Sequence, residues 1–145
     1  MDRRSMLALA AGAAAALPAM AQTTGHEHHH APAAATPRKF DALMAAHQQC
    51  VSAAQVCINH CQTLLAQGDK VMAECLRTAL DTEAVCATVA KMAGWNSKFA
   101  GTYAQQSITV MQACLEACKP HLEHHAECKA CHDACVKAID ASRKA

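Results

Sequence analysis

Apolar side chains recur every three or four positions along four long stretches of this 145-residue chain, and helix-breaking residues separate the stretches. This period indicates amphipathic helices. We predict helices over residues 40–67, 70–93, 98–118 and 121–142. The breaks are Gly68-Asp69, Gly94-Trp95-Asn96-Ser97 and Lys119-Pro120. Four helices joined by short links predict an all-α fold, an antiparallel up-down four-helix bundle, in a domain over residues 39–145.

Ten cysteines lie on the core-facing stripes of these predicted helices. Within a helix they are separated by three, four, seven or eleven positions, so each returns to the same face. They are Cys50, Cys57 and Cys61 in the first helix, Cys75 and Cys86 in the second, Cys114 and Cys118 in the third, and Cys128, Cys131 and Cys135 in the fourth. The same stripes carry His47, Met72, Met111 and His121. We therefore expect a core lined with sulfur.

Two ordinary explanations account poorly for this stripe. Buried cysteine often serves as a small hydrophobic residue, but that explains one or two better than ten in register. A disulfide scaffold suits an even count, yet such scaffolds are usually short and rich in loops, and neighbours on one helix seldom have the geometry that a disulfide requires.

Soft-metal binding is the interpretation that uses every cysteine. Thiolates and thioethers favour copper(I), whereas a structural zinc site needs only four ligands. A whole core of sulfur predicts storage of multiple copper(I) ions per chain. Because many unpaired thiolates would be too costly in a low-dielectric interior, we expect the metal-free thiols to be protonated and loading to release protons.

The N-terminal residues predict export. Residues 1–21 combine a charged head containing Arg3 and Arg4, an apolar run and a small-residue cleavage signal, the features of a signal peptide; the arginine pair fits the twin-arginine route. Residues 22–38 form a histidine-rich segment without apolar periodicity, which we expect to be a flexible tail. These features predict a periplasmic protein after signal removal.

Charge and hydropathy exclude two kinds of partner. Once residues 1–21 are set aside, basic and acidic side chains balance, so nothing favours nucleic acid. The apolar run near the N-terminus is too short to span a bilayer, and no later segment is predicted to do so.

Several short motifs, in this order, resemble the copper storage protein family, in its exported twin-arginine branch. They are Cys57-Ile58-Asn59-His60-Cys61, Met72-Ala73-Glu74-Cys75, Ala93-Gly94-Trp95-Asn96-Ser97 and Ala126-Glu127-Cys128-Lys129-Ala130-Cys131 with Cys135. The resemblance implies a homotetramer of bundles, copper(I) inside each bundle, and an entrance ringed by His and Met. His60 and Met72 match that entrance, and the antiparallel order brings Cys118 and His121 to the same end of the bundle.

The sequence also departs from the family pattern. Leu64 and Gln67 replace expected entrance methionines, Met111 replaces an expected core cysteine, and the fourth predicted helix lacks late cysteines. We therefore predict a lower capacity than fuller members have, with vacant sites at the end of the bundle where the fourth helix finishes. The predicted metal ligands are the ten cysteines with His60, Met72, Met111 and His121.

One motif supports a different class of protein. Residues Cys128 to His132 form Cys-x-x-Cys-His, the attachment sequence of c-type haem, and exported cytochromes of the c-prime type are four-helix bundles of similar size. Eight further cysteines would have no role in such an electron carrier. No nucleophile–base constellation is present in the sequence, so we predict that the protein is not an enzyme.

Overall fold

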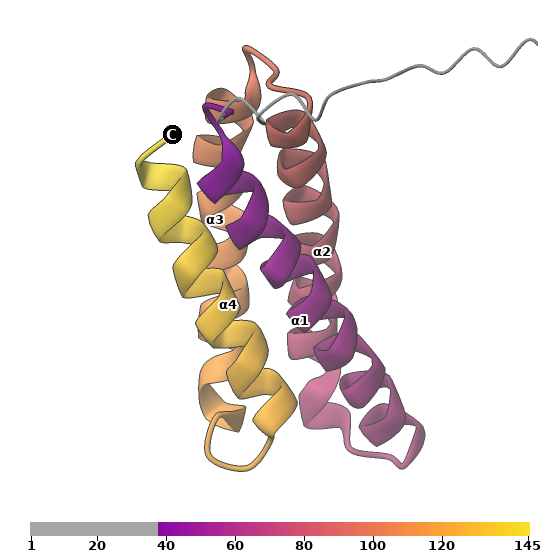
Figure 1. Cartoon of the computed structure of the whole chain (residues 1–145). Coiled ribbons are helices and arrows are strands. Elements are labelled where there is room, and N and C mark those ends of the chain that lie inside the picture. The colour runs from indigo at the N-terminus through magenta and orange to yellow at the C-terminus, as the bar shows by residue number, and fades with distance from the viewer. Residues whose placement is uncertain (1–37) are drawn as a thin grey trace, which may run out of the picture. The chain divides into compact units, whose positions relative to one another are not determined.

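The computed structural model describes residues 38–145, which form an antiparallel four-helix bundle (Figure 1). The helices are α1 (Asp41–Ala66), α2 (Ala73–Gly94), α3 (Ala100–Cys118) and α4 (Ala126–Arg143), with 3-10 turns η1 (Lys70–Met72) and η2 (Lys119–His121). Each of α1 and α3 packs against both α2 and α4. The predicted fold class is confirmed, whereas the predicted signal peptide and histidine-rich segment lie outside the described residues, save Arg38.

Left-handed residues end the first two helices. At the end of α1, Gly68 has φ +95, and the N–H groups of Gly68 and Asp69 donate to the carbonyls of Leu65 and Leu64, each at 3.0 Å. This is a Schellman motif, and Asp69 then caps η1 by accepting from the Val71 N–H. The predicted break at Gly68-Asp69 is confirmed.

At the end of α2 the left-handed residue is Asn96, with φ 53, and not the glycine that the sequence offers. Gly94 is the last residue of α2, and a Cβ there would lie 3.2 Å from Met44 Sδ. The place that a Cβ would take at Gly94 is thus next to the tip of the Met44 side chain from α1, while Asn96 makes the turn, because asparagine tolerates the left-handed conformation better than most residues.

The predicted start of the fourth helix at residue 121 is wrong. Pro120, which lacks an N–H, lies in η2, and the chain turns through residues 122–124 before α4 begins at Ala126. His125 precedes α4 with extended backbone, φ −132 and ψ 104. His121 and His124 therefore lie in the turn before the helix and not on the α4 stripe.

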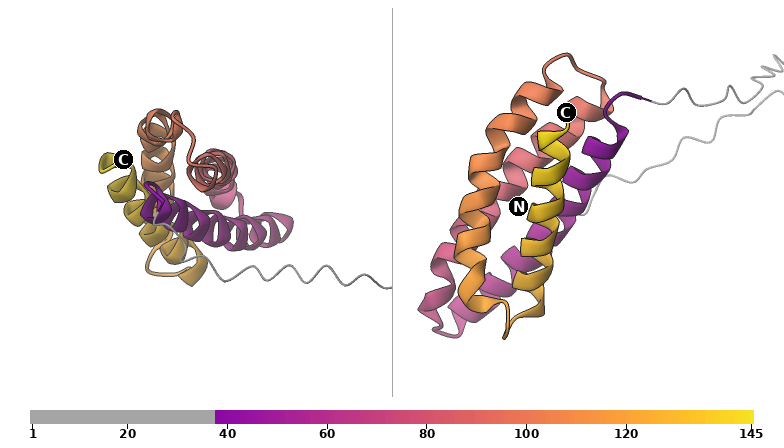
Figure 2. Two further views of the ribbon diagram at one scale, coloured as in Figure 1. Left: turned by 45° about the horizontal axis from the view of Figure 1, so that its top comes forward. Right: turned by 90° about the vertical axis from the view of Figure 1, so that its left-hand side faces the viewer.

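Two clusters of buried side chains fill the bundle. The larger contains all ten cysteines with Met72, Met111 and small or branched aliphatic residues. The smaller, which we call the apolar pole, is hydrocarbon and comprises Phe40, Leu43, Val89, Ala93, Ala100 and Ala104. It lies at the end where α1 and α3 begin and α2 and α4 finish, the upper end in Figure 1 and in the right-hand view of Figure 2.

None of the four helices within residues 38–145 is both long enough and apolar enough to cross a bilayer.

Candidate metal centre

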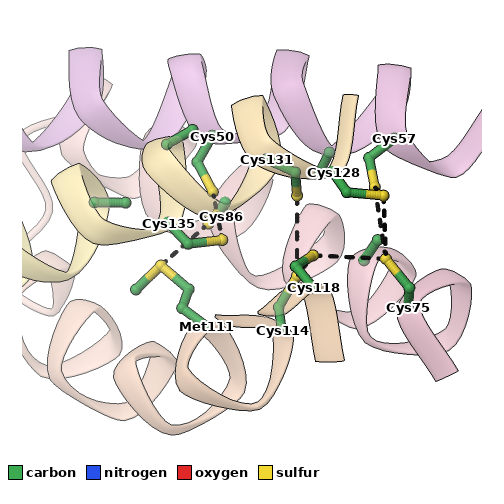
Figure 3. Close-up of a cluster of buried hydrophobic side chains, with 14 of the residues drawn as sticks. Cys50, Cys57, Cys75, Cys86, Met111, Cys114, Cys118, Cys128, Cys131 and Cys135 are labelled. Atoms are coloured by element: carbon green, nitrogen blue, oxygen red, sulfur yellow. Dashed lines mark hydrogen bonds between the residues drawn. The ribbon is translucent and has the colours of Figure 1, made fainter. Parts of the chain in front are cut away.

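All ten cysteines are free thiols with no exposed surface. Their sulfur atoms converge from all four helices on the axis of the bundle and form a column along it (Figure 3). The helical spacing explains the column, because residues three, four, seven or eleven apart stack above one another on one face. The sequence prediction of an inward-facing cysteine stripe is therefore confirmed on each helix.

The densest part of the column lies toward the end of α1. Cys57, Cys61, Cys75 and Cys128 place their sulfurs within 4.8 Å of one another, in a group drawn from α1, α2 and α4. Cys57 Sγ lies 3.8 Å from Cys75 Sγ and 3.9 Å from the sulfurs of Cys61 and Cys128. Four convergent thiols at this separation can share soft cations.

The column continues through α3. Cys75 Sγ lies 3.5 Å from Cys118 Sγ, and Cys114 Sγ lies 3.9 Å from the sulfurs of Cys118 and Cys131. Two further groups of three, Cys57 with Cys118 and Cys131, and Cys114 with Cys131 and Cys135, share members with their neighbours. Shared members make the groups one continuous site.

The column ends toward the apolar pole with a pair of thiols and a thioether contact. Cys50 Sγ is 3.7 Å from Cys135 Sγ, and the Cys86 thiol donates to Met111 Sδ at 3.6 Å. Met111 has no exposed surface, so its sulfur occupies a place in the column that another thiol could fill.

The thiols titrate as a coupled set. Hydrogen bonds with Cys118 and Cys128, and then burial, raise the pKa of Cys57 far above its ordinary value. The hydrogen bond with Cys50, followed by burial, likewise raises the pKa of Cys86. In contrast, hydrogen bonds from Cys135 and Cys86 lower the pKa of Cys50 to about 4. The S–H groups around Cys50 thus stabilise its thiolate, while Cys57 and Cys86 stay protonated. The expectation that every metal-free thiol is protonated therefore does not hold at Cys50.

Histidines gather beyond the thiols, where α1 and α3 finish. His60 Nε2 lies 2.9 Å from His125 Nδ1, and His60 Nδ1 lies 3.6 Å from a carboxylate oxygen of Glu127. The rings of His121 and His125 have centroids 5.9 Å apart. We call His60, His121 and His125 the histidine pole. Its members are partly exposed or barely buried, whereas nearby Met72 has no exposed surface.

The predicted site residues are therefore brought together at this end and along the axis. The ten cysteines, Met72 and Met111 form one buried cluster, and His60 and His121 lie at one end of it. The sequence did not place His125 or Glu127 among the site residues, and both follow the α3–α4 turn and contact His60. The one sequence feature that could have indicated Glu127 as part of the site is its position directly before Cys128.

A further histidine, His47, is buried near the opposite end of the column. It lies on α1 one turn before Cys50, has no exposed surface, and places Nε2 2.9 Å from Ser142 Oγ. Burial lowers the pKa of His47 to about 4, so the ring is neutral near pH 7. The sequence stripe included His47, but its contact with α4 could not be foreseen.

The geometry disfavours the haem alternative. Cys128 and Cys131 both face the bundle axis and lie 3.9 Å from the sulfurs of Cys57 and Cys114 respectively. His132, the motif's expected axial ligand, instead lies 3.3 Å from the exposed carboxylate of Asp133. The two cysteines of the motif therefore contact buried sulfur atoms, whereas its histidine contacts an exposed carboxylate.

Comparison with a solved structure supports the fold. The apo form of copper storage protein 3 from Bacillus subtilis is similar over 71% of this chain and 94% of that chain, with a TM-score of 0.61. Because the two chains share only 24% sequence identity, this likeness shows the common bundle and not a common activity. No curated protein matches the sequence.

Comparison with protein families identifies the group. The family described as copper storage protein matches residues 36–145, a range that includes all four helices and every cysteine. The match agrees with the free thiols that line the axis of the bundle. The chain belongs to the copper storage protein family.

Proposed function

We propose that this protein stores multiple copper(I) ions on the thiolates of its core and takes no part in catalysis. The observation that carries the proposal is the sulfur column: ten free, fully buried thiols, with the closest pair 3.5 Å apart. Thiolate and thioether donors favour copper(I) over harder cations. A column of overlapping cysteine groups suits many ions, whereas a single metal site would need only one such group.

Proton exchange explains how such a core accepts charge. A protonated thiol is neutral, and a thiolate with one copper(I) ion is neutral as well. Each ion that binds a new thiolate therefore releases a proton, and the buried core acquires no large net charge. Where two thiolates share an ion, the excess negative charge is spread over neighbours that donate S–H bonds.

The histidine pole supports uptake from that end. Imidazole is a suitable ligand for copper, and the three partly exposed or barely buried histidines lie at the end of the bundle nearest the group formed by Cys57, Cys61, Cys75 and Cys128. We propose that His60, His121 and His125 pass copper(I) to these thiols, with buried Met72 as a thioether contact on the way. Glu127, at 3.6 Å from His60, favours cations near the ring.

Export and assembly are part of the same proposal. The Arg3-Arg4 signal supports twin-arginine export into the periplasm, where the protein would buffer copper or supply it to exported copper proteins. The homotetramer that the resemblance implies is part of the proposal as well. Fractionation of cells that carry Arg3→Lys with Arg4→Lys tests the route, and light scattering of the purified protein tests the assembly.

A copper(I) titration of the reduced, purified full chain under anaerobic conditions tests storage. We expect thiolate-to-copper absorbance in the near ultraviolet to rise until roughly as many ions are bound as there are cysteines. The variant with all ten cysteines replaced by serine should show no such absorbance. Saturation at one or two ions contradicts storage, and a Soret band in the protein as isolated supports the haem alternative.

A further inference from the structure

The boundary between the sulfur column and the apolar pole contains a polar pair that the thiol chemistry does not use. His47 and Ser142 have no exposed surface, and they come from α1 and α4. Along the bundle they lie between the last thiols of the sulfur column and the apolar pole. A histidine and a serine in this position call for a physical reason, since burying polar groups is costly.

The hydrogen bond between the pair satisfies only half of the imidazole. His47 Nε2 lies 2.9 Å from Ser142 Oγ, but His47 Nδ1 is buried without any hydrogen-bond partner. An unsatisfied buried nitrogen costs about 1–3 kcal/mol. If Nε2 carries the proton and donates it to Ser142 Oγ, then Nδ1 presents a free lone pair in the core.

This arrangement is that of a metal-binding histidine. Imidazoles that bind metals almost always donate their other N–H to a fixed partner, which sets the tautomer and the ring orientation. Ser142 supplies that partner here. Neutral imidazole nitrogen is also a suitable copper ligand beside thiolate.

A thiol stands one helical turn away. Cys50 follows His47 by three positions, a spacing that places two side chains on the same face of a helix. Cys50 Sγ in turn lies 3.7 Å from Cys135 Sγ. His47 is thus continuous with the column, although at the end opposite the histidine pole.

We propose that His47 Nδ1 and Cys50 Sγ bind a copper(I) ion and so close the sulfur column with a mixed nitrogen–sulfur site. The inference rests on the proposed storage function. A copper(I) ion bound to the Cys50 thiolate is neutral as a pair, and the neutral imidazole adds no charge, so the loaded site is neutral; any proton still on the thiol leaves to solvent. It supplies a donor at the end of the bundle where the absence of late cysteines on α4 predicted vacancy.

The test follows the histidine ring nitrogens by NMR during copper(I) loading of the isotope-labelled full chain. We expect the Nδ1 resonance of His47 to shift strongly while Nε2 stays protonated. His47→Gln, whose amide can still donate to Ser142, should bind about one ion fewer than the parent protein and keep the thiolate absorbance of the rest. His132→Gln is the matched control on the outer side of α4 and should keep full capacity.

The variant Ser142→Ala tests whether His47 acts as a copper ligand or only as a packing residue. It keeps the imidazole and removes the partner of Nε2, so copper should still shift Nδ1, with a weaker hold on that ion. If the column fills with thiolate-bound copper while Nδ1 of His47 does not move, this inference is overturned and storage stands. If no thiolate absorbance develops in the parent protein, storage itself fails, and the His47 site fails with it.

Discussion

At the histidine pole, α1 and α3 end, α2 and α4 begin, and partly exposed imidazoles lie close to the carboxylate of Glu127. At the apolar pole the same four helices close around Phe40, Leu43 and Val89, each at most 6% exposed. The sulfur column joins these two ends. The comparison shows a division of labour, because hydrocarbon burial is the main source of folding stability while polar, partly exposed donors give ions a path.

The largest effect on folding should come from the apolar pole. Leu43→Ala removes a side chain that is 3% exposed, and we expect the free energy of unfolding to fall by about 2–5 kcal/mol. Chemical denaturation of the reduced, copper-free protein measures this. Cys61→Ser is the matched change in the column, and it should cost less stability but reduce copper capacity. Equal losses of stability would erase the distinction between the two regions.

Acid should destabilise the copper-free protein through His47. Its pKa is lowered from 6.5 to about 4 in the folded state, so the unfolded chain binds the proton more readily. The free energy of unfolding should therefore be unaffected by this group above about pH 6.5 and should fall between pH 6.5 and 4, by up to roughly 3 kcal/mol.

His47→Gln provides the control for this pH dependence. The variant should be less sensitive than the parent protein over the same interval, as measured by urea denaturation at several pH values. A parent and a variant with parallel pH profiles would show that His47 does not govern acid stability.

The histidine pole should affect rates more than capacity. His60→Ala combined with His125→Ala removes the pair joined at 2.9 Å, and we expect copper(I) uptake to slow up to about tenfold, or ~1.4 kcal/mol in the barrier. Stopped-flow absorbance measures the rate and equilibrium titration the capacity. His132→Ala, on the outer side of α4, should change neither. Unchanged uptake in the double variant counts against this pole as the entrance.

The smallest effects should come from the two left-handed turns. Gly68→Ala, at φ +95, should destabilise the protein by about 1 kcal/mol, because a Cβ is strained there. Asn96→Gly, at φ 53, should instead be neutral or slightly stabilising, since glycine relieves the same strain. Thermal unfolding of the two variants compares them. A loss at Asn96 as large as that at Gly68 would mean that the asparagine side chain has another role.

The bundle and its cysteine stripe were predictable from sequence because both depend on local periodicity. Three- and four-residue steps give the face of Cys57 and Cys61 without any knowledge of the neighbouring helix. Met111 was recognised as a departure from a cysteine pattern, and its contact with Cys86 at 3.6 Å is a matter of packing between α2 and α3.

What could not be predicted depends on the geometry of turns and on contacts between helices. The α3–α4 turn delays α4 until Ala126 and leaves His125 with extended backbone, which brings its ring to His60. Likewise, the pairing of His47 with Ser142 joins residues from opposite ends of the domain sequence. Spacing along one helix carries no information about such partners.

The closed hydrocarbon end has a consequence for the order of events in the core. If ions enter and leave only at the histidine pole, those bound last leave first. An ion near Cys50 must have passed the thiols closer to the histidine pole, and it can leave only after those thiols have released their ions. Ions deep in the column would then form a slow reserve, whereas those beside Cys61 and Cys75 would exchange quickly with a partner. The release of copper from such a protein would therefore follow at least two rates, although the ligands along most of its length are chemically the same.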